Sequence, residues 1–102
     1  MIKILSLKLR KDIEYVLGTS VEILAILSED KPYSITITIL DPTSYTMVDK
    51  VAMSRVNTGI YNYIYQSAST DQDGEYIATV SVSDGTKTTV RQITFILPEQ
   101  LD

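Results

Sequence analysis

The sequence predicts an all-β sandwich of about seven antiparallel strands, formed by one domain. The chain has 102 residues, a length that suits a single hydrophobic core. Ile, Val, Tyr and Thr are abundant, and these β-branched and aromatic side chains favour a pleated sheet over a helix. No window of helical length shows an apolar repeat with the 3.6-residue period of an amphipathic helix.

The predicted strands are short segments in which apolar and polar residues alternate, as expected when one face is buried and the other faces water. In chain order they are Ile2–Leu9, Ser20–Ser28, Tyr33–Ile39, Met47–Val56, Ile60–Gln66, Glu75–Ser83 and Lys87–Leu97. The third is the clearest, because its Ile residues alternate with Ser and Thr. In the first, Leu5, Leu7 and Leu9 are expected to share one face.

Turn-forming residues separate these segments, and glycine marks several of the turns. Gly59, Gly74 and Gly85 are predicted to have structural roles, because glycine adopts a positive φ without steric cost. Gly85 follows an Asp, and this pair predicts a hairpin turn between the last two strands. Pro98 cannot donate to a ladder and is expected to end the last strand. We therefore expect one domain over residues 1–98 and a short mobile tail over 99–102.

Four segments resemble immunoglobulin-like modules of tailed-phage virion proteins, bacterial and archaeal surface proteins and macroglobulin-type domains. Tyr15–Ile23 is similar to the start of their second strand, with an aromatic residue, then Gly, then Val-x-Ile. Thr58–Tyr61 and Asp73–Ala78 carry the Gly-x-Tyr pattern that begins later strands, and Thr94–Leu97 is similar to a closing strand. The resemblance implies an immunoglobulin-like β-sandwich.

The same resemblance implies a structural role for Tyr76. Its hydroxyl would bond back to the preceding loop and form a tyrosine corner. Two features differ from antibody domains: Ala78 stands two residues after Tyr76, where those domains carry Cys, and the chain has no Trp. The core is therefore expected to be stabilised by packing alone.

The residue types exclude most kinds of catalytic site. The chain has no His and no Cys, so Ser-His-Asp catalysis, Cys nucleophiles, disulfides and zinc sites built from these residues are excluded. We expect no enzymatic activity and no cofactor.

The net charge of −4 disfavours nucleic acid as a partner, and the cluster of Lys8, Arg10 and Lys11 is interpreted as a solvated strand end. No apolar run approaches the ~20 residues of a membrane span, so no membrane insertion is expected.

Asp71, Asp73 and Glu75 form an acidic cluster in the loop before the sixth predicted strand and at the start of that strand. They are candidate ligands for Ca²⁺, which binds several oxygen atoms. However, the segment lacks the third ligand before the Gly and the later bidentate Glu of a calcium loop. The alternative is a turn in which Asp caps backbone groups.

Tyr61, Tyr63 and Tyr65 alternate along one predicted strand and therefore share one face. They are candidate interaction residues, because an exposed tyrosine ridge suits binding to protein or carbohydrate. The alternative is that this face packs within the sandwich while the Ile face lies outside, or the reverse.

The sequence favours a non-enzymatic structural or protein-interaction module. The first hypothesis is a small phage virion component, such as a capsid decoration, head-fibre or tail protein, because the sandwich has its own Met1, no signal sequence and no disulfide. The alternatives are an adhesion or spacer domain of a bacterial or archaeal cell-surface protein, or a carbohydrate-binding module that uses the tyrosine face. The expected partners are proteins, including virion proteins or a second copy of the chain, or carbohydrate. The expected location is the virion, or else the cell surface or extracellular space.

Overall fold

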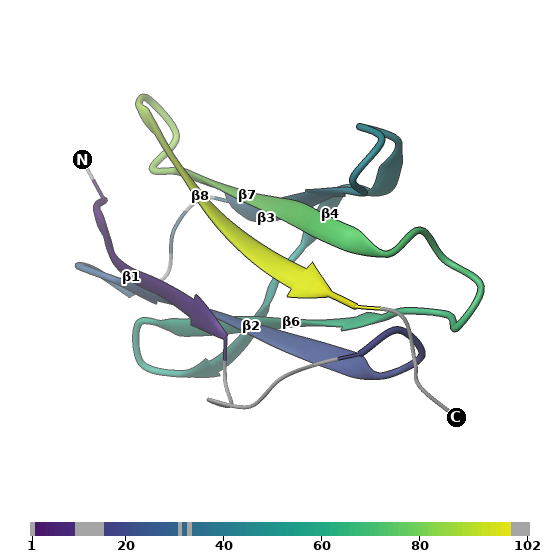
Figure 1. The fold of residues 1–102 in the computed structure, drawn as a ribbon. Coiled ribbons are helices and arrows are strands. Elements are labelled where there is room, and N and C mark those ends of the chain that lie inside the picture. The colour runs from purple at the N-terminus through teal and green to yellow at the C-terminus, as the bar shows by residue number, and fades with distance from the viewer. Residues whose placement is uncertain (1, 10–15, 31, 33, 99–102) are drawn as a thin grey trace.

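The strands of the computed structural model pair into two antiparallel sheets, and no helix occurs among the described residues (Figure 1). The structure describes residues 2–9, 16–30, 32 and 34–98. The strands described are β1 (Ile4–Leu9), β2 (Ser20–Leu27), β3 (Ser34–Leu40), β4 (Thr46–Ala52), β5 (Ser54–Asn57), β6 (Ile60–Gln66), β7 (Gly74–Ser83) and β8 (Thr88–Leu97). Tyr15, Arg10, Lys11 and the predicted tail over 99–102 lie outside the described residues.

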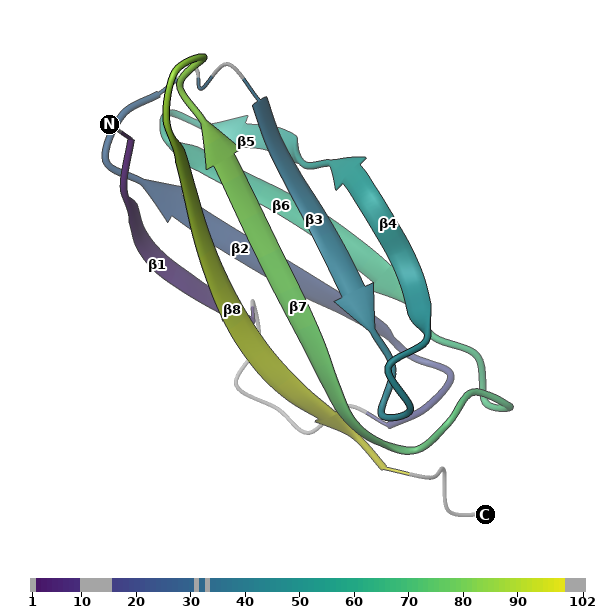
Figure 2. The same cartoon turned by 90° about the horizontal axis from the view of Figure 1, so that it is seen from above.

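Each sheet contains four strands, and the two sheets lie face to face. Sheet A has the order β1-β2-β6-β5, and sheet B has the order β4-β3-β7-β8. The Cα atoms extend over 47 × 25 × 16 Å, so the molecule is elongated along the strands (Figure 2). The N-terminal end of β1 and the C-terminal end of β8 lie at opposite ends of the long axis (Figure 2). The all-β, two-sheet fold is therefore confirmed, with eight described strands in place of about seven.

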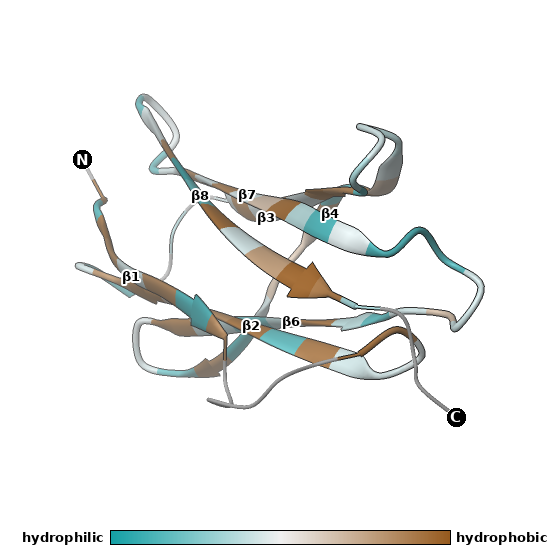
Figure 3. Cartoon of the chain, viewed as in Figure 1, coloured by the Kyte–Doolittle hydropathy of each residue, from teal (hydrophilic) through white to brown (hydrophobic). Residues whose placement is uncertain are grey.

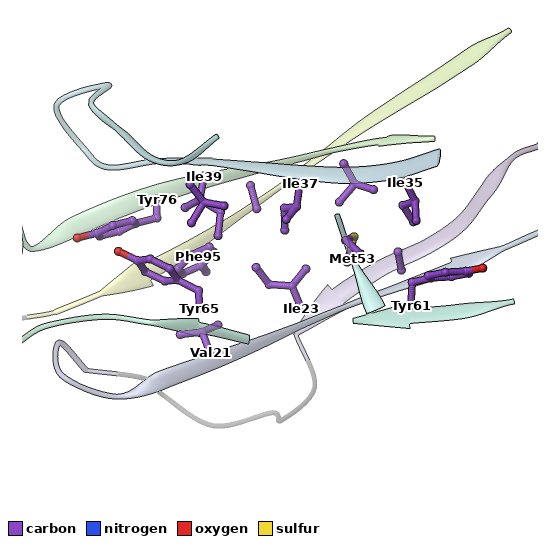
Figure 4. Packing of buried hydrophobic residues seen from close by; sticks show 14 of the residues in the cluster. Val21, Ile23, Ile35, Ile37, Ile39, Met53, Tyr61, Tyr65, Tyr76 and Phe95 are labelled. Atoms are coloured by element: carbon purple, nitrogen blue, oxygen red, sulfur yellow. The ribbon is translucent and has the colours of Figure 1, made fainter. Parts of the chain in front are cut away.

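The core lies between the sheets and is supplied by alternate residues of the central strands (Figure 4). The prediction for the third segment is confirmed, because its Ile residues are buried while the Ser and Thr between them lie on the outer side. Hydropathy follows the same alternation along the strands, and the loop before β7 is hydrophilic (Figure 3). Fully buried side chains from facing strands include Val21, Ile23, Ala25, Ile37, Ile39, Tyr76, Ala78, Val80 and Leu97. Burying each larger aliphatic side chain contributes about 1.5–3 kcal/mol.

A β-bulge in strand β1 interrupts the alternation of inward and outward side chains. Ile4 is buried, whereas Leu5 is 59% exposed. The register with β2 shifts between Ile4 and Ser6, so Leu5 is the extra residue, and Leu7 and Leu9 return to the core side. The prediction that the three Leu residues share one face is therefore wrong for Leu5, because the bulge interrupts the two-residue period.

The segment 47–56, predicted as one strand, forms two strands in different sheets. β4 pairs with β3 in sheet B, and β5 pairs with β6 in sheet A. Between them, Met53 is buried in the core, and its N–H donates to the carbonyl of Ile35 at 3.1 Å. At the crossing between the two sheets, Met53 is the residue whose side chain points into the core. This crossing explains why the segment lacks a regular alternation.

The hairpin predicted at Asp84 and Gly85 is present between β7 and β8, which pair along their whole length. One carboxylate oxygen of Asp84 accepts hydrogen bonds from the N–H groups of Thr86 and Lys87 at 2.8 and 2.7 Å. The backbone bonds from Lys87 and Thr86 lower the pKa of Asp84 below its ordinary value. Gly85 has a φ of 98°, as its predicted role requires. β8 ends immediately before Pro98, as predicted.

Two side chains of β8 bridge to β1 and close one side of the sandwich. The Thr89 hydroxyl donates to the carbonyl of Ile2 at 2.8 Å, and the Arg91 guanidinium donates to the carbonyl of Ile4 at 3.1 Å. The carbonyl of Lys3, which lies between them, accepts from the N–H of Ser28, so the carbonyls of Ile2 and Ile4 lie on the opposite edge of this segment. These side chains therefore satisfy part of an edge that would otherwise be open to pairing with another chain.

Candidate functional site

The three alternating tyrosines of β6 face the core. Tyr61 and Tyr65 are 6% and 5% exposed and Tyr63 is half-buried, whereas Ile64 on the opposite face is 57% exposed. The pairing with β2 explains this orientation, because each Tyr lies opposite an inward residue of β2, and the small Ala25 stands opposite Tyr61. The predicted exposed tyrosine ridge is therefore wrong. The sequence of β6 alone does not reveal which of its two faces points into the core.

Tyr76 makes the bond to the preceding loop that the resemblance implies. Its side chain is fully buried, and its hydroxyl donates to the carbonyl of Gln72 at 2.6 Å. Its ring stacks on Phe95, with centroids 5.6 Å apart and planes 17° apart, and it lies 6.1 Å from the ring of Tyr65. Burial, together with the nearby charge of Asp71, raises the pKa of Tyr76. The hydrogen bond fixes the loop before β7 to the end of the core.

Tyr65 lies beside Tyr76, and both hydroxyls are at the same end of the core (Figure 4). The Tyr65 hydroxyl is buried and has no hydrogen-bond partner among the described residues. Burial, with smaller contributions from the charges of Asp71 and Asp41, raises the pKa of Tyr65 to about 12. A phenol held in this way stays protonated at neutral pH and is a poor nucleophile or base.

The acidic loop before β7 forms a turn. A carboxylate oxygen of Asp71 accepts from the N–H of Ala68 at 2.8 Å, and the Asp71 N–H donates to the Ala68 carbonyl at 3.0 Å. The part of the chain that the structure describes contains no group of three or more acidic residues arranged to hold a metal ion. Asp71, Asp73 and Glu75 are thus not brought together as cation ligands, and Asp71 takes the capping role that was the alternative.

Two of the predicted glycines have conformations that a side chain would strain. Gly74 has a φ of 130°, and a Cβ atom there would lie 3.0 Å from the ring of Pro42. Gly59 has a φ of 69°, and its N–H donates to a carboxylate oxygen of Asp30 at 2.9 Å. The same Asp30 forms an ion pair with Arg55 at 2.8 Å. These contacts join the turn before β6 to the loop after β2.

Other carboxylates of the described chain also cap turns. One oxygen of Asp41 accepts from the Thr43 hydroxyl and from the N–H groups of Thr43 and Tyr45 at 2.7–2.9 Å. The Thr43 hydroxyl, more than the backbone bonds, lowers the pKa of Asp41. A general acid for glycoside hydrolysis requires the opposite shift. Asp41, like Asp84, is therefore suited to holding a loop and not to donating a proton.

On strands β3, β7 and β8, the outer face of sheet B carries mainly uncharged polar side chains, and we call this part of the sheet the hydroxyl face. It comprises Ser34, Thr36 and Thr38 of β3, Thr79, Ser81 and Ser83 of β7, and Thr88, Gln92 and Thr94 of β8. In β3 and β7 these residues alternate with buried ones, and the register with β7 places Thr88, Gln92 and Thr94 of β8 on the same outer side. The sequence analysis did not select this face, although the Ser and Thr alternation in β3 and β7 is visible in the sequence.

The outer face of sheet A is different, because its centre is apolar. Ile26 pairs with Ile60, Leu24 pairs with Asn62, and Ile64 follows on the same face. Ile64 is 57% exposed, whereas Leu24 is 9% exposed. The two outer faces of the sandwich therefore offer different chemistry to a partner.

Comparison with known proteins gives a structural similarity but no family. No protein-family model matches the chain, and no curated protein matches it. A solved structure of the endo-β-1,4-mannanase from Thermotoga petrophila is similar, with a TM-score of 0.65 and 18% sequence identity. The similarity covers 93% of this chain and 19% of the mannanase chain. Almost the whole of this chain thus corresponds to about a fifth of a longer carbohydrate-degrading protein.

This similarity overturns the functional prediction made from the sequence. A phage virion component was predicted, and the adhesion or spacer domain and the module that binds through Tyr61, Tyr63 and Tyr65 were its alternatives. The structural neighbour is a glycoside hydrolase and not a virion protein. Burial of Tyr61 and Tyr65 also removes the exposed face on which the last alternative depended. No helix of the described residues is long and apolar enough to cross a membrane. At 18% identity, the comparison establishes a shared all-β fold.

Proposed function

We propose that the chain is an immunoglobulin-like sandwich. In that class, one sheet contains strands A, B, E and D, and the other contains C, F and G with an additional strand C′ in some members. The order β1-β2-β6-β5 corresponds to A-B-E-D, and the order β4-β3-β7-β8 corresponds to C′-C-F-G. The corner residue Tyr76 near the start of β7 has the position that such domains give to a Tyr at the start of strand F.

Within that fold, we propose a non-catalytic accessory module of a polysaccharide-degrading protein. The observation that carries this proposal is that 93% of the chain corresponds to 19% of an endo-β-1,4-mannanase. A unit of this size within a much longer enzyme is expected to support or target the catalytic part. The opposite placement of the ends of β1 and β8 suits a module inserted in series within a longer chain (Figure 2).

The residues support a role without catalysis. Hydrolysis of a glycosidic bond requires two carboxyl groups on either side of the substrate, one of them with a raised pKa. In the described chain, Asp41 and Asp84 have lowered pKa values, and Asp71 is held by a backbone N–H. The charged residues of the described strands lie mainly in edge strands: Lys8 in β1, Asp49 and Lys50 in β4, Arg55 in β5 and Arg91 in β8.

The test is binding of the purified chain to polysaccharide in the absence of any catalytic domain. We expect retardation in native gels that contain soluble glucomannan, and depletion from solution by insoluble β-1,4-mannan. We expect no release of reducing sugar from either substrate. Gels without polysaccharide and gels that contain dextran are the controls. Equal mobility in every gel would contradict a targeting role, and release of reducing sugar would contradict the absence of catalysis.

A further inference from the structure

The hydroxyl face of sheet B is continuous across three strands. Cross-strand pairing aligns Thr38 with Thr79 and Thr79 with Gln92, and it aligns Thr36 with Ser81 in the next row. Neighbouring side chains are spaced about 4.8 Å apart between strands and about 6.8 Å apart along a strand. The face is therefore a regular grid of polar groups and not a scatter of separate residues.

No ionisable side chain interrupts this grid. The outward positions between its polar residues carry Leu40, Ile77, Val90 and Ile96. Charged residues lie at its borders, with Glu75 at the start of β7 and Asp49 and Lys50 on the neighbouring strand β4, beside Thr38. Charged residues make up 22% of the chain, and exposed strand positions are where they usually occur. Ser and Thr are common on solvated strands, but a three-strand surface whose interior carries no charge suits a neutral partner better than an ionic one.

Several hydroxyls of the grid are free to bind a ligand. Within the described chain, Gln92 donates to the Thr79 hydroxyl at 3.1 Å, and the Thr38 hydroxyl accepts from the Lys50 N–H at 3.2 Å. In the same part of the chain, the hydroxyls of Thr36, Ser81 and Thr94 form no hydrogen bond with the protein. Each of these can both donate and accept, which is the requirement for contact with another hydroxyl.

We propose that the hydroxyl face binds a β-1,4-linked mannose chain, lying across β3, β7 and β8. This inference rests on the proposed accessory function and assigns the face that performs it. The ligand is an uncharged polymer whose hydroxyl groups repeat along its length. The hydroxyl face and the ligand are therefore both uncharged, and the donors and acceptors of one can bond to those of the other. Each contact is weak, because water competes for it, but contacts repeated along one chain add together.

The test compares two sets of substitutions on opposite faces. The first variant combines Thr36→Val, Ser81→Ala and Thr94→Val, which remove hydroxyls from the grid and keep nearly the same shape. The matched control combines Ser6→Ala, Ser20→Ala and Ser54→Ala on sheet A. Affinity for soluble glucomannan is measured by gel retardation, and folding is checked by thermal unfolding. We expect the first variant to lose about tenfold or more in affinity and the control to bind like the unchanged chain.

A second measurement locates the ligand without any substitution. We expect mannohexaose to shift the backbone amide NMR signals of β3, β7 and β8, including those of Thr38, Thr79 and Gln92. Shifts confined to β2 and β6, or an equal loss of affinity in both variants, would overturn the inference while the accessory function stands. No binding of the unchanged chain to any mannan would overturn the targeting function itself. A dimer in light scattering that the first variant abolishes would show that the face binds a second copy, and would also overturn the inference.

Discussion

At the scale of single residues, the hydroxyl of Tyr76 has a defined structural contribution. It donates to the Gln72 carbonyl at 2.6 Å and fixes the loop that leads into β7. Tyr76→Phe removes this bond and keeps the stacked ring, so we expect the free energy of unfolding to fall by about 1 kcal/mol. Urea unfolding measures this change. An unchanged midpoint would show that the corner bond contributes nothing to stability.

The neighbouring hydroxyl of Tyr65 is buried, and no described residue bonds to it, so the same substitution should have a different result. Tyr65→Phe is expected to leave the free energy of unfolding unchanged or to raise it by up to about 1 kcal/mol, because no bond is lost. The unfolded pKa is about 10 and the folded pKa is about 12. Folding therefore favours the protonated phenol. This contribution is fully present below pH 10 and is lost as pH rises towards 12.

Unfolding measured from pH 9 to pH 12 tests this assignment. The unchanged chain should lose stability across that range, and Tyr65→Phe should lose less. Tyr61→Phe is the matched control, because it removes the hydroxyl of a buried tyrosine at the other end of the core and leaves Tyr65 and Tyr76 in place (Figure 4). A clear loss of stability at neutral pH in Tyr65→Phe would show that its hydroxyl has a partner.

At the scale of elements, the start of β7 depends on Gly74. Its φ of 130° strains any other residue, and an added Cβ would lie 3.0 Å from the Pro42 ring. We expect Gly74→Ala to lower the free energy of unfolding by about 1–3 kcal/mol. Gly18→Ala is the control, because Gly18 has a φ of 94° but a Cβ there meets Ser69 at an ordinary 3.6 Å. If denaturant unfolding shows that both variants lose the same free energy of unfolding, the contact with Pro42 adds nothing to the cost of Gly74→Ala.

Local patterns in the sequence predicted an element well where its structure depends on residues that are close together in the sequence. The Ile alternation of β3 and the hairpin at Gly85 each depend on a few neighbouring residues, whereas the corner at Tyr76 was implied by the resemblance of Asp73–Ala78 to immunoglobulin-like modules. The bulge at Leu5 and the burial of Tyr61 depend on how β1 and β6 pair with β2, which no single segment encodes. The crossing at Met53 was missed for the same reason. The outer faces were predictable as polar or apolar, but their partners were not.

At the scale of the whole molecule, stability should differ between the central and edge strands. Ile37 of β3 and Val80 of β7 pair at the middle of sheet B, and both are fully buried. All residues of β5 are exposed. We expect the amides of Ile37 and Val80 to exchange with deuterium more than about a hundredfold slower than those of β5. Similar rates in both places would mean that the sandwich opens as one unit.

The placement of the chain ends along the long axis gives the module a mechanical property. A pull applied between the start of β1 and the end of β8 would slide β1 along β2 and β8 along β7 (Figure 2). Antiparallel hydrogen bonds run perpendicular to the strands, so this force loads many of them at once instead of opening them in turn. The bridges from Thr89 and Arg91 to β1 add to the resistance. We therefore expect a high rupture force in single-molecule stretching, as a unit that transmits tension through a longer chain would need.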